Sequence, residues 1–169
     1  MTTSWADFAS AAPAHAALVR KRFGAHRHHV LATLRADGSP RVTGLEADIS
    51  GGELWLGMMP GSRKALDLRR DPRFALHANP GAGTEMEDGD VRVAGRAVEV
   101  TDPGTLARYA DAAPEGERPE VFHLFRADLT EVVRTYLVLP DMCLDVWRPG
   151  APLRTLRRGN DDAPAREDP

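Results

Sequence analysis

Residues 60–72 read Pro-Gly-Ser-Arg-Lys-Ala-Leu-Asp-Leu-Arg-Arg-Asp-Pro, and they place one short helix inside a series of strands. The Gly-Ser pair at 61–62 predicts the start of this helix, and Pro72 predicts its end. Leu66 and Leu68 supply its apolar stripe. A small antiparallel β-barrel with one inserted helix is the architecture that this arrangement favours.

The charges of this helix are unusual at its first turn. Cations stabilise the C-terminus of a helix and destabilise its N-terminus, each by roughly 0.3–1 kcal/mol. Arg69 and Arg70 follow that rule, whereas Arg63 and Lys64 do not. Free N–H groups, an approach through Ser62 and two added cations predict a site for a phosphate or another dianion. The alternative is that both cations are solvated and the helix tolerates them.

Short runs of apolar residues on both sides of this helix predict six or seven strands joined by tight turns. Such spacing indicates an antiparallel meander. A change in apolar phase at Gly95 predicts a β-bulge, of the kind that curls a sheet into a barrel. The expected strands span residues 29–35, 41–49, 53–58, 73–78, 90–101, 129–139 and 142–147.

The remaining segments divide the chain into an N-terminal packing helix (1–25), a barrel domain (26–149) and a tail (150–169). The first helix starts at a capping-box pattern at Ser4, and Pro13 is expected to interrupt it. Further helices are predicted from Asp102 to Ala112 and, more briefly, over residues 120–125. Residues 80–89 are expected to form a mobile loop, and the Arg-, Asp- and Pro-rich tail to be disordered.

Composition excludes several classes of protein. The chain has 169 residues, 42% of them hydrophobic and 28% charged, which is typical of one globular domain. A net charge of −3 argues against nucleic acid as the main partner. Cys143 is the single cysteine, so no disulfide within the chain and no cysteine-based zinc site is expected. The sequence has no signal pattern and no long apolar run, so a cytoplasmic protein without a membrane span is expected.

The sequence resembles the pyridoxamine 5′-phosphate oxidase-like family, the FMN-binding split barrels, in the order and spacing of five segments over roughly residues 26–149. The segment Gly61-Ser62-Arg63-Lys64-Ala65 is the most specific of them. The matching segments are Leu31–Leu34, Asp37–Val42, Leu54–Gly57, Gly61–Ala65 with Leu68, and Asp71–Leu76.

This resemblance implies a mostly β fold, a six-stranded antiparallel split barrel, and a homodimer with flavin sites at its interface. It implies that Ser62, Arg63 and Lys64 hold the phosphate of FMN. Arg41, Val42 and Thr43 are then expected beside the isoalloxazine ring, and Leu56, Gly57 and Met58 at its flank. The C-terminal Arg-Leu-Asn-Pro substrate signature of the family's namesake enzyme is absent, which argues against oxidation of pyridoxamine phosphate itself.

Each of these residues also has a simpler interpretation. Ser62 is a helix cap as well as a candidate ligand. Arg41 is a solvated strand end if it does not contact the flavin, and Thr43 suits a strand in any case. Met58 is a core residue or a cover for a flat ring. Trp147 is a candidate for stacking on the cofactor or at the dimer groove, with core packing as the alternative.

The function that these features predict is that of a flavin-dependent oxidoreductase acting on a small molecule by hydride transfer. A reductase that uses the deazaflavin coenzyme F420 and a non-enzymatic flavin or haem binder are the alternatives. No metal site is expected from His26, His28 and His29, because neighbouring residues of a strand point to opposite faces. Haem would need an axial ligand such as His77 or His123, and nothing in the sequence selects one.

Overall fold

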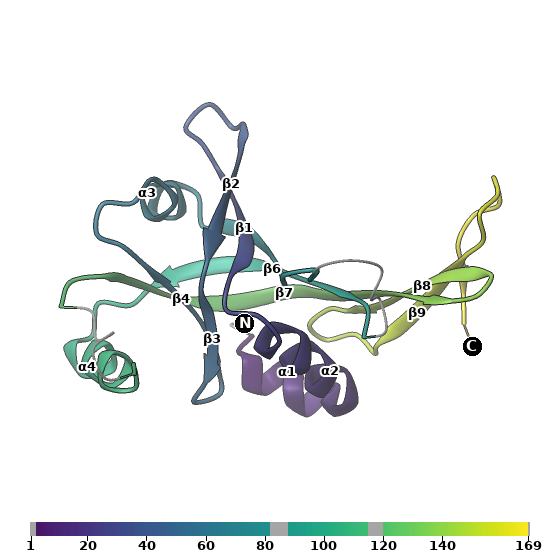
Figure 1. The fold of residues 1–169 in the computed structure, drawn as a ribbon, viewed down its shortest axis with the longest axis horizontal. Coiled ribbons are helices and arrows are strands. Elements are labelled where there is room, and N and C mark those ends of the chain that lie inside the picture. The colour runs from purple at the N-terminus through teal and green to yellow at the C-terminus, as the bar shows by residue number, and fades with distance from the viewer. Residues whose placement is uncertain (1–2, 82–87, 115–119, 169) are drawn as a thin grey trace.

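The computed structural model describes residues 3–81, 88–114 and 120–168. In Figure 1 these residues form a curved antiparallel sheet from which an arm made by the C-terminal strands extends. The helices are α1 (Trp5–Ala11), α2 (Pro13–Gly24), α3 (Arg63–Arg70) and α4 (Pro103–Asp111). The strands are β1 (His29–Leu34), β2 (Pro40–Leu45), β3 (Ala47–Ser50), β4 (Glu53–Met58), β5 (Arg73–His77), β6 (Asp90–Glu99), β7 (His123–Val138), β8 (Asp141–Trp147), β9 (Arg154–Arg158) and β10 (Arg166–Glu167).

Six of these strands, in the order β2-β1-β5-β6-β7-β4, form the barrel sheet. All of their pairings are antiparallel, and the described structure contains no backbone pairing between β2 and β4. The fold is therefore the mostly β split barrel that the sequence predicts. Strand β3 is added beside β4, on the edge opposite β7.

Strand β7 organises this sheet because it pairs with three others. Its first residues pair with β4, its last residues pair with β8, and β6 runs along its other edge. The register between β6 and β7 shifts at Gly95, which confirms the predicted bulge. A side chain at this position is excluded, because a Cβ built there would lie 2.2 Å from the backbone oxygen of Asp128.

The core lies inside the curved sheet and continues under the two N-terminal helices. Helix α1 begins at a capping box between Ser4 and Asp7, and Pro13 starts a second helix, as expected from its position. The largest fully buried side chains are Trp5, Phe8, Val19, Leu31, Leu54, Leu56, Leu68, Leu76, Val91, Leu124, Phe125 and Leu129.

The structure differs from the sequence prediction in the strands around the barrel seam. The single strand expected over 41–49 is two strands, because the chain leaves β1 after Leu45 and pairs with β4 from Ala47 onward. The helix expected over 120–125 is wrong, because strand β7 begins at His123 and pairs with β4 there. Inter-strand pairing decides both segments, and local pattern does not contain that information.

The predicted disorder of residues 150–169 is also at odds with the structure. Strand β9 pairs with β8, and β10 pairs with β9, so the described residues of this segment extend the sheet. Ion pairs hold the added strands, with Arg154 on Glu167 and Arg166 on Asp141. The same high charge that suggested disorder supplies these pairs.

Candidate functional site

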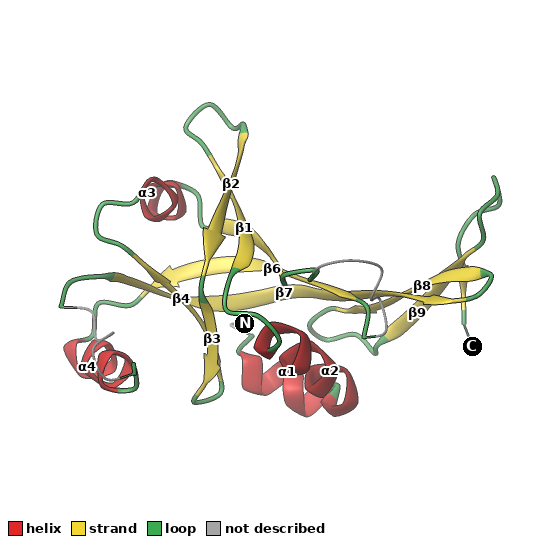
Figure 2. Cartoon of the chain, viewed as in Figure 1, coloured by secondary structure: helices red, strands yellow, loops and turns green. Residues whose placement is uncertain are grey.

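A groove of about 1140 Å³ lies where β2, β4, α3 and α4 meet. Figure 2 shows α3 and α4 on either side of the same end of β4. The groove exceeds the volume of roughly 300–1,000 Å³ usual for small-molecule sites, so it can hold a cofactor with room beside it. Of the residues proposed from the sequence, Gly57, Met58 and Lys64 line it.

Lys64, in the first turn of α3, places a cation in the lining of this groove, whereas its neighbours Ser62 and Arg63 do not line it. The Lys64 ammonium donates a hydrogen bond to the backbone oxygen of Gly44, 2.5 Å away, and burial lowers the pKa of Lys64. Arg63 is exposed and has no ion pair within the described residues. A partly desolvated ammonium and an unpaired guanidinium at a helix start both gain from a bound anion.

Ser62 precedes this turn but does not cap it. Its backbone is extended, as in an N-cap, yet its hydroxyl accepts no hydrogen bond from the helix. The hydroxyl oxygen is buried and has no partner within the described residues. A buried hydroxyl without a hydrogen bond is costly, and a ligand oxygen is one group that would satisfy it.

Arg41 does not line the groove and binds Asp67 of α3. Its Nε lies 2.6 Å from the carboxylate, which also accepts hydrogen bonds from Thr33 and Arg70. Burial raises the pKa of Asp67, but the hydrogen bonds from Arg41, Thr33 and Arg70 outweigh it and leave the pKa lowered. In this structure, therefore, Arg41 joins β2 to α3.

Gly57 allows α4 to approach the sheet. A Cβ built on Gly57 would lie 2.7 Å from the hydroxyl oxygen of Tyr109, so the absence of a side chain makes room for this tyrosine. Burial, together with the charges of Asp48 and Glu46, raises the pKa of Tyr109. Tyr109 thus stays a neutral hydrogen-bond donor at the wall of the groove.

The other residues proposed from the sequence lie outside the groove. Leu56 is fully buried in the core, and Trp147 is 2% exposed and packs on Phe8 at a ring separation of 4.7 Å. For Trp147 the structure thus agrees with the packing alternative. Val42 faces outward with 66% exposure. Thr43 has a buried hydroxyl without a hydrogen-bond partner and precedes Gly44, a residue of the groove.

Sequence reasoning missed the groove residues that come from β3 and α4. Glu46 pairs with Arg27 at 2.8 Å and with His28 at 3.1 Å, so this end of the groove carries both signs of charge. No pattern in the sequence around Tyr109 indicates that it belongs to the site. The one available hint was Gly57, because a glycine inside a strand often marks a close approach by another group.

The histidines do not gather into a metal-ligating cluster within the part of the chain that the structure describes. No cluster of three metal-ligating side chains occurs there. His123 accepts a hydrogen bond on Nε2 from the backbone of Gly61, which helps to hold the loop before α3. Of the helices that are described, none is long and apolar enough to cross a membrane.

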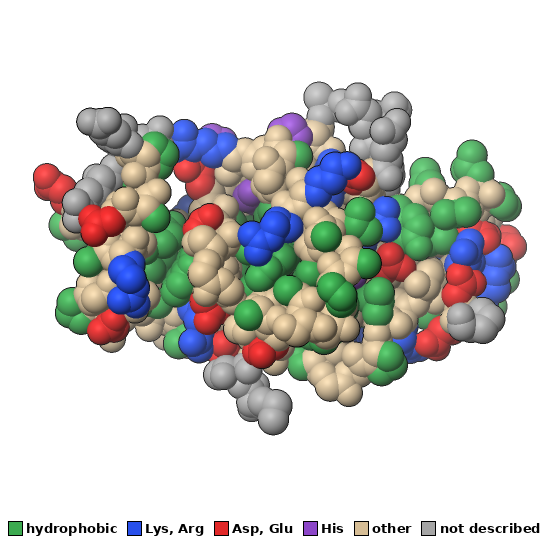
Figure 3. Space-filling view, turned by 90° about the horizontal axis from the view of Figure 1, so that it is seen from below, with side chains coloured by type: hydrophobic (Ala, Val, Ile, Leu, Met, Phe, Trp, Pro, Cys, Tyr) green, Lys and Arg blue, Asp and Glu red, His purple; other side chains and the backbone are tan. Residues whose placement is uncertain are grey.

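Acidic and basic side chains are interspersed with hydrophobic ones on the face seen from below in Figure 3. Many of these charges form ion pairs, such as Lys21 with Asp88 at 2.8 Å. The loop expected at 80–89 lies largely outside the described residues.

Comparison with known proteins agrees with this geometry. A family profile described as pyridoxamine 5′-phosphate oxidase matches residues 14–136, which include the whole groove and the helix that carries its cations. The chain belongs to this family. No curated protein matches the sequence of this member of the pyridoxamine 5′-phosphate oxidase family.

Solved structures show the same fold at low identity to this pyridoxamine 5′-phosphate oxidase family member. A conserved hypothetical protein from Mycobacterium tuberculosis is 25% identical, with a TM-score of 0.53 over 69% of this chain and 81% of that one. A pyridoxamine 5′-phosphate oxidase-related, FMN binding protein from Nostoc punctiforme is 16% identical, with a TM-score of 0.56 over 94% and 96%. ChuZ from Campylobacter jejuni is 12% identical, with a TM-score of 0.64 over 82% and 61%.

Proposed function

We propose that the protein is a flavin-dependent oxidoreductase that binds FMN in the groove between β4, α3 and α4. The observation that carries this proposal is the buried, unpartnered hydroxyl of Ser62 beside Arg63 and Lys64. Three consecutive residues suited to a phosphate stand at one helix start, and one of them, Lys64, lines the groove. No ion pair among the described residues occupies Arg63 or Lys64. The family membership and the FMN-binding relative from Nostoc punctiforme support the same cofactor.

The rest of the groove suits a flat aromatic ring. Met58, Met59, Pro60 and Phe122 provide apolar walls, and thioethers adapt well to ring surfaces. The Tyr109 hydroxyl adds a hydrogen-bond donor, and burial raises its pKa further above neutral pH. The residues present therefore fit the ring as well as the phosphate of FMN.

A second copy of the chain is proposed to complete this site. Met59 at the rim is 78% exposed, and Val42 on the adjacent strand β2 is 66% exposed. Large apolar side chains exposed next to a binding groove are typical of a surface that another chain covers. A homodimer would bury these side chains and exclude water from the ring.

When bound, FMN supplies hydride transfer between its ring and a small substrate. The side chains of this protein contribute binding and orientation. Arg63 and Lys64 would hold the phosphate, and Met58 and Tyr109 would position the ring. The carboxylate of Glu46, also in the lining of the groove, is held by Arg27 and His28, which gives an incoming substrate groups of both charges to bind.

Titration of the purified protein with FMN, coenzyme F420 and haem in parallel tests this proposal. We expect saturable binding of FMN, with one site for each chain and quenched flavin fluorescence. Preferential binding of F420 would support a deazaflavin-dependent reductase instead, because that coenzyme can use the same phosphate contacts. Binding of haem alone, or of none of the three, would contradict the proposal.

A further inference from the structure

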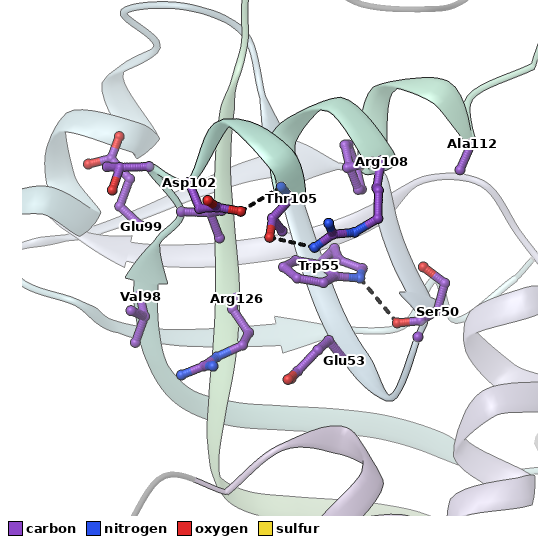
Figure 4. Close-up of a pocket in the computed structure, with 14 residues that line it drawn as sticks. Ser50, Glu53, Trp55, Val98, Glu99, Asp102, Thr105, Arg108, Ala112 and Arg126 are labelled. Carbon is purple, nitrogen blue, oxygen red and sulfur yellow. Dashed lines mark hydrogen bonds between the residues drawn. The ribbon is translucent and has the colours of Figure 1, made fainter.

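A second cavity, separate from the groove, lies on the outer face of the barrel beneath α4. Its volume is about 630 Å³, and strands β4, β6 and β7 form its floor. Glu53 and Trp55 alternate along β4 with the buried Leu54 and Leu56, so their side chains face outward into this cavity. Figure 4 shows Glu53 and Arg126 beneath Trp55, with α4 above them.

Glu53 is the least satisfied charged group of this cavity. Its oxygen Oε2 is buried without a hydrogen-bond partner in the described structure. Burial raises the pKa of Glu53, and the nearby positive charge of Arg126 only partly opposes this effect. A cation that enters from the cavity would stabilise the ionised form of this partly exposed carboxylate.

Arg126 is also incompletely paired. Its Nη2 donates to Asp128 at 3.3 Å, while its Nε is buried and has no partner within the described residues. The side chain is 33% exposed, so N–H donors at the end of the guanidinium remain available to a further acceptor group. A carboxylate in the cavity is the acceptor that a guanidinium prefers.

The other charged side chains around the cavity are already engaged. Glu99 receives two hydrogen bonds from Arg69, at 2.9 and 2.6 Å. Asp102 accepts from the backbone of Thr105 at 2.7 Å and caps α4, and Arg108 donates to the Thr105 hydroxyl at 2.8 Å. Arg108 also keeps free N–H donors, but its side chain is exposed. Glu53 and Arg126 are thus the two charged side chains of this cavity that have a buried polar atom without a hydrogen-bond partner among the described residues, and they have opposite charges.

Trp55 gives the cavity an aromatic wall. Its indole N–H donates to the backbone oxygen of Ser50 at 3.1 Å, so its polar edge is already satisfied. The ring of Tyr109 lies 6.2 Å from that of Trp55 in an edge-on arrangement, and Val98 adds an apolar surface. An aromatic group can pack here, and an ammonium group near Trp55 would gain a cation–π contact.

We propose that this cavity binds a small zwitterion with an aromatic body, of the chemical class of the aromatic α-amino acids. Its ammonium group would contact Glu53, its carboxylate would contact Arg126, and its ring would pack on Trp55. The site does not depend on the proposed binding of FMN, although the two cavities are neighbours and share the lining residues Ser50, Tyr109 and Ala112.

Calorimetric titration with three related probes tests this proposal. Phenylalanine carries both charged groups, phenethylamine lacks the carboxylate, and phenylpropionate lacks the amine. We expect phenylalanine to bind most tightly and each of the other two at least tenfold more weakly. Failure of phenylalanine to bind, or equal binding of phenylpropionate, would overturn the proposal.

Two variants locate the binding. Glu53→Gln keeps the size of the side chain. It should weaken the binding of phenylalanine at least tenfold and leave the affinity for phenylpropionate unchanged. Glu120→Gln changes an exposed residue outside the cavity and serves as the matched control. Equal binding of phenylalanine by both variants would overturn the proposal. Urea denaturation shows whether both variants are folded, independently of any binding of FMN.

Discussion

The guanidinium Nε of Arg41 lies 2.6 Å from the carboxylate of Asp67, and this contact ties strand β2 to helix α3. Asp67 is 3% exposed, and Arg70 and Thr33 bind the same carboxylate. Both elements contribute to the groove, so the pair fixes the distance between its walls. Arg41 therefore acts through α3, as a positioning residue.

Asp67→Asn removes the negative charge that Arg41 and Arg70 both contact. The free energy of unfolding should fall by roughly 3–5 kcal/mol, as is typical when one partner of a buried ion pair is lost. Arg41 and Arg70 would then be left without their shared carboxylate. Denaturation in urea measures the change. Asp161→Asn makes the same change on an exposed residue, and an equal effect of both variants would contradict the importance of the buried pair.

Ser62→Ala separates a helix cap from a ligand contact. Loss of a serine cap normally costs about 0.5–2 kcal/mol, but the Ser62 hydroxyl makes no capping hydrogen bond here. We expect the free protein to be as stable as before or slightly more stable, because a buried unpartnered hydroxyl is removed. Binding of FMN should weaken by roughly 1.5–3 kcal/mol, the value of a hydrogen bond to a charged group. Loss of stability without loss of affinity would show that Ser62 is only a cap.

The double variant Arg63→Ala with Lys64→Ala tests the phosphate contacts directly. Each lost charge-assisted hydrogen bond should cost roughly 1.5–3 kcal/mol of FMN affinity. Riboflavin has no phosphate, so its weaker binding should not change between the variant and the unaltered protein. Arg73→Ala with Arg92→Ala removes two cations from strands β5 and β6, away from the first turn of α3, and serves as the control. If riboflavin lost as much affinity as FMN, the two cations would not be phosphate ligands.

The barrel could be predicted because its signals are local. Tight turns bound the strands, Pro72 ends α3, and the phase shift at Gly95 matches the register shift between β6 and β7. The same local reasoning failed at residues 120–125. There the strand forms because β4 offers a partner, and that partner lies far away in the sequence.

The candidate site was only partly predictable for the same reason. The cationic start of α3 could be inferred because it is contained in one short segment. By contrast, the role of Arg41 depends on a carboxylate 26 residues away in the sequence. The exposure of Leu66 within helix α3 was also not predictable from the sequence of the helix alone. The sequence predicts it in the apolar stripe of α3, but it is 41% exposed, because Ala65 and Leu68 form the buried face instead.

The two most buried histidines should make the protein less stable in mild acid. Burial lowers the pKa of His15 from 6.5, with the charge of Asp145 opposing this shift and that of Arg134 adding to it. Burial likewise lowers the pKa of His29, and the charges of His26 and His28 act in the same direction. The unfolded chain therefore binds more protons than the folded protein once the pH falls below 6.5.

His15→Leu tests this origin of the pH dependence. Each histidine contributes a slope of at most about 1.4 kcal/mol per pH unit, so stability should fall as the pH drops from neutral to about one unit below 6.5. The leucine keeps the buried position apolar and takes up no proton, so the variant should lose less stability over the same interval. Urea denaturation at both ends of the interval measures the difference. Carboxylates with lowered pKa values, such as that of Asp67, remain ionised throughout this interval and do not contribute to the loss. Parallel pH curves for the variant and the unaltered protein would show that His15 does not cause it.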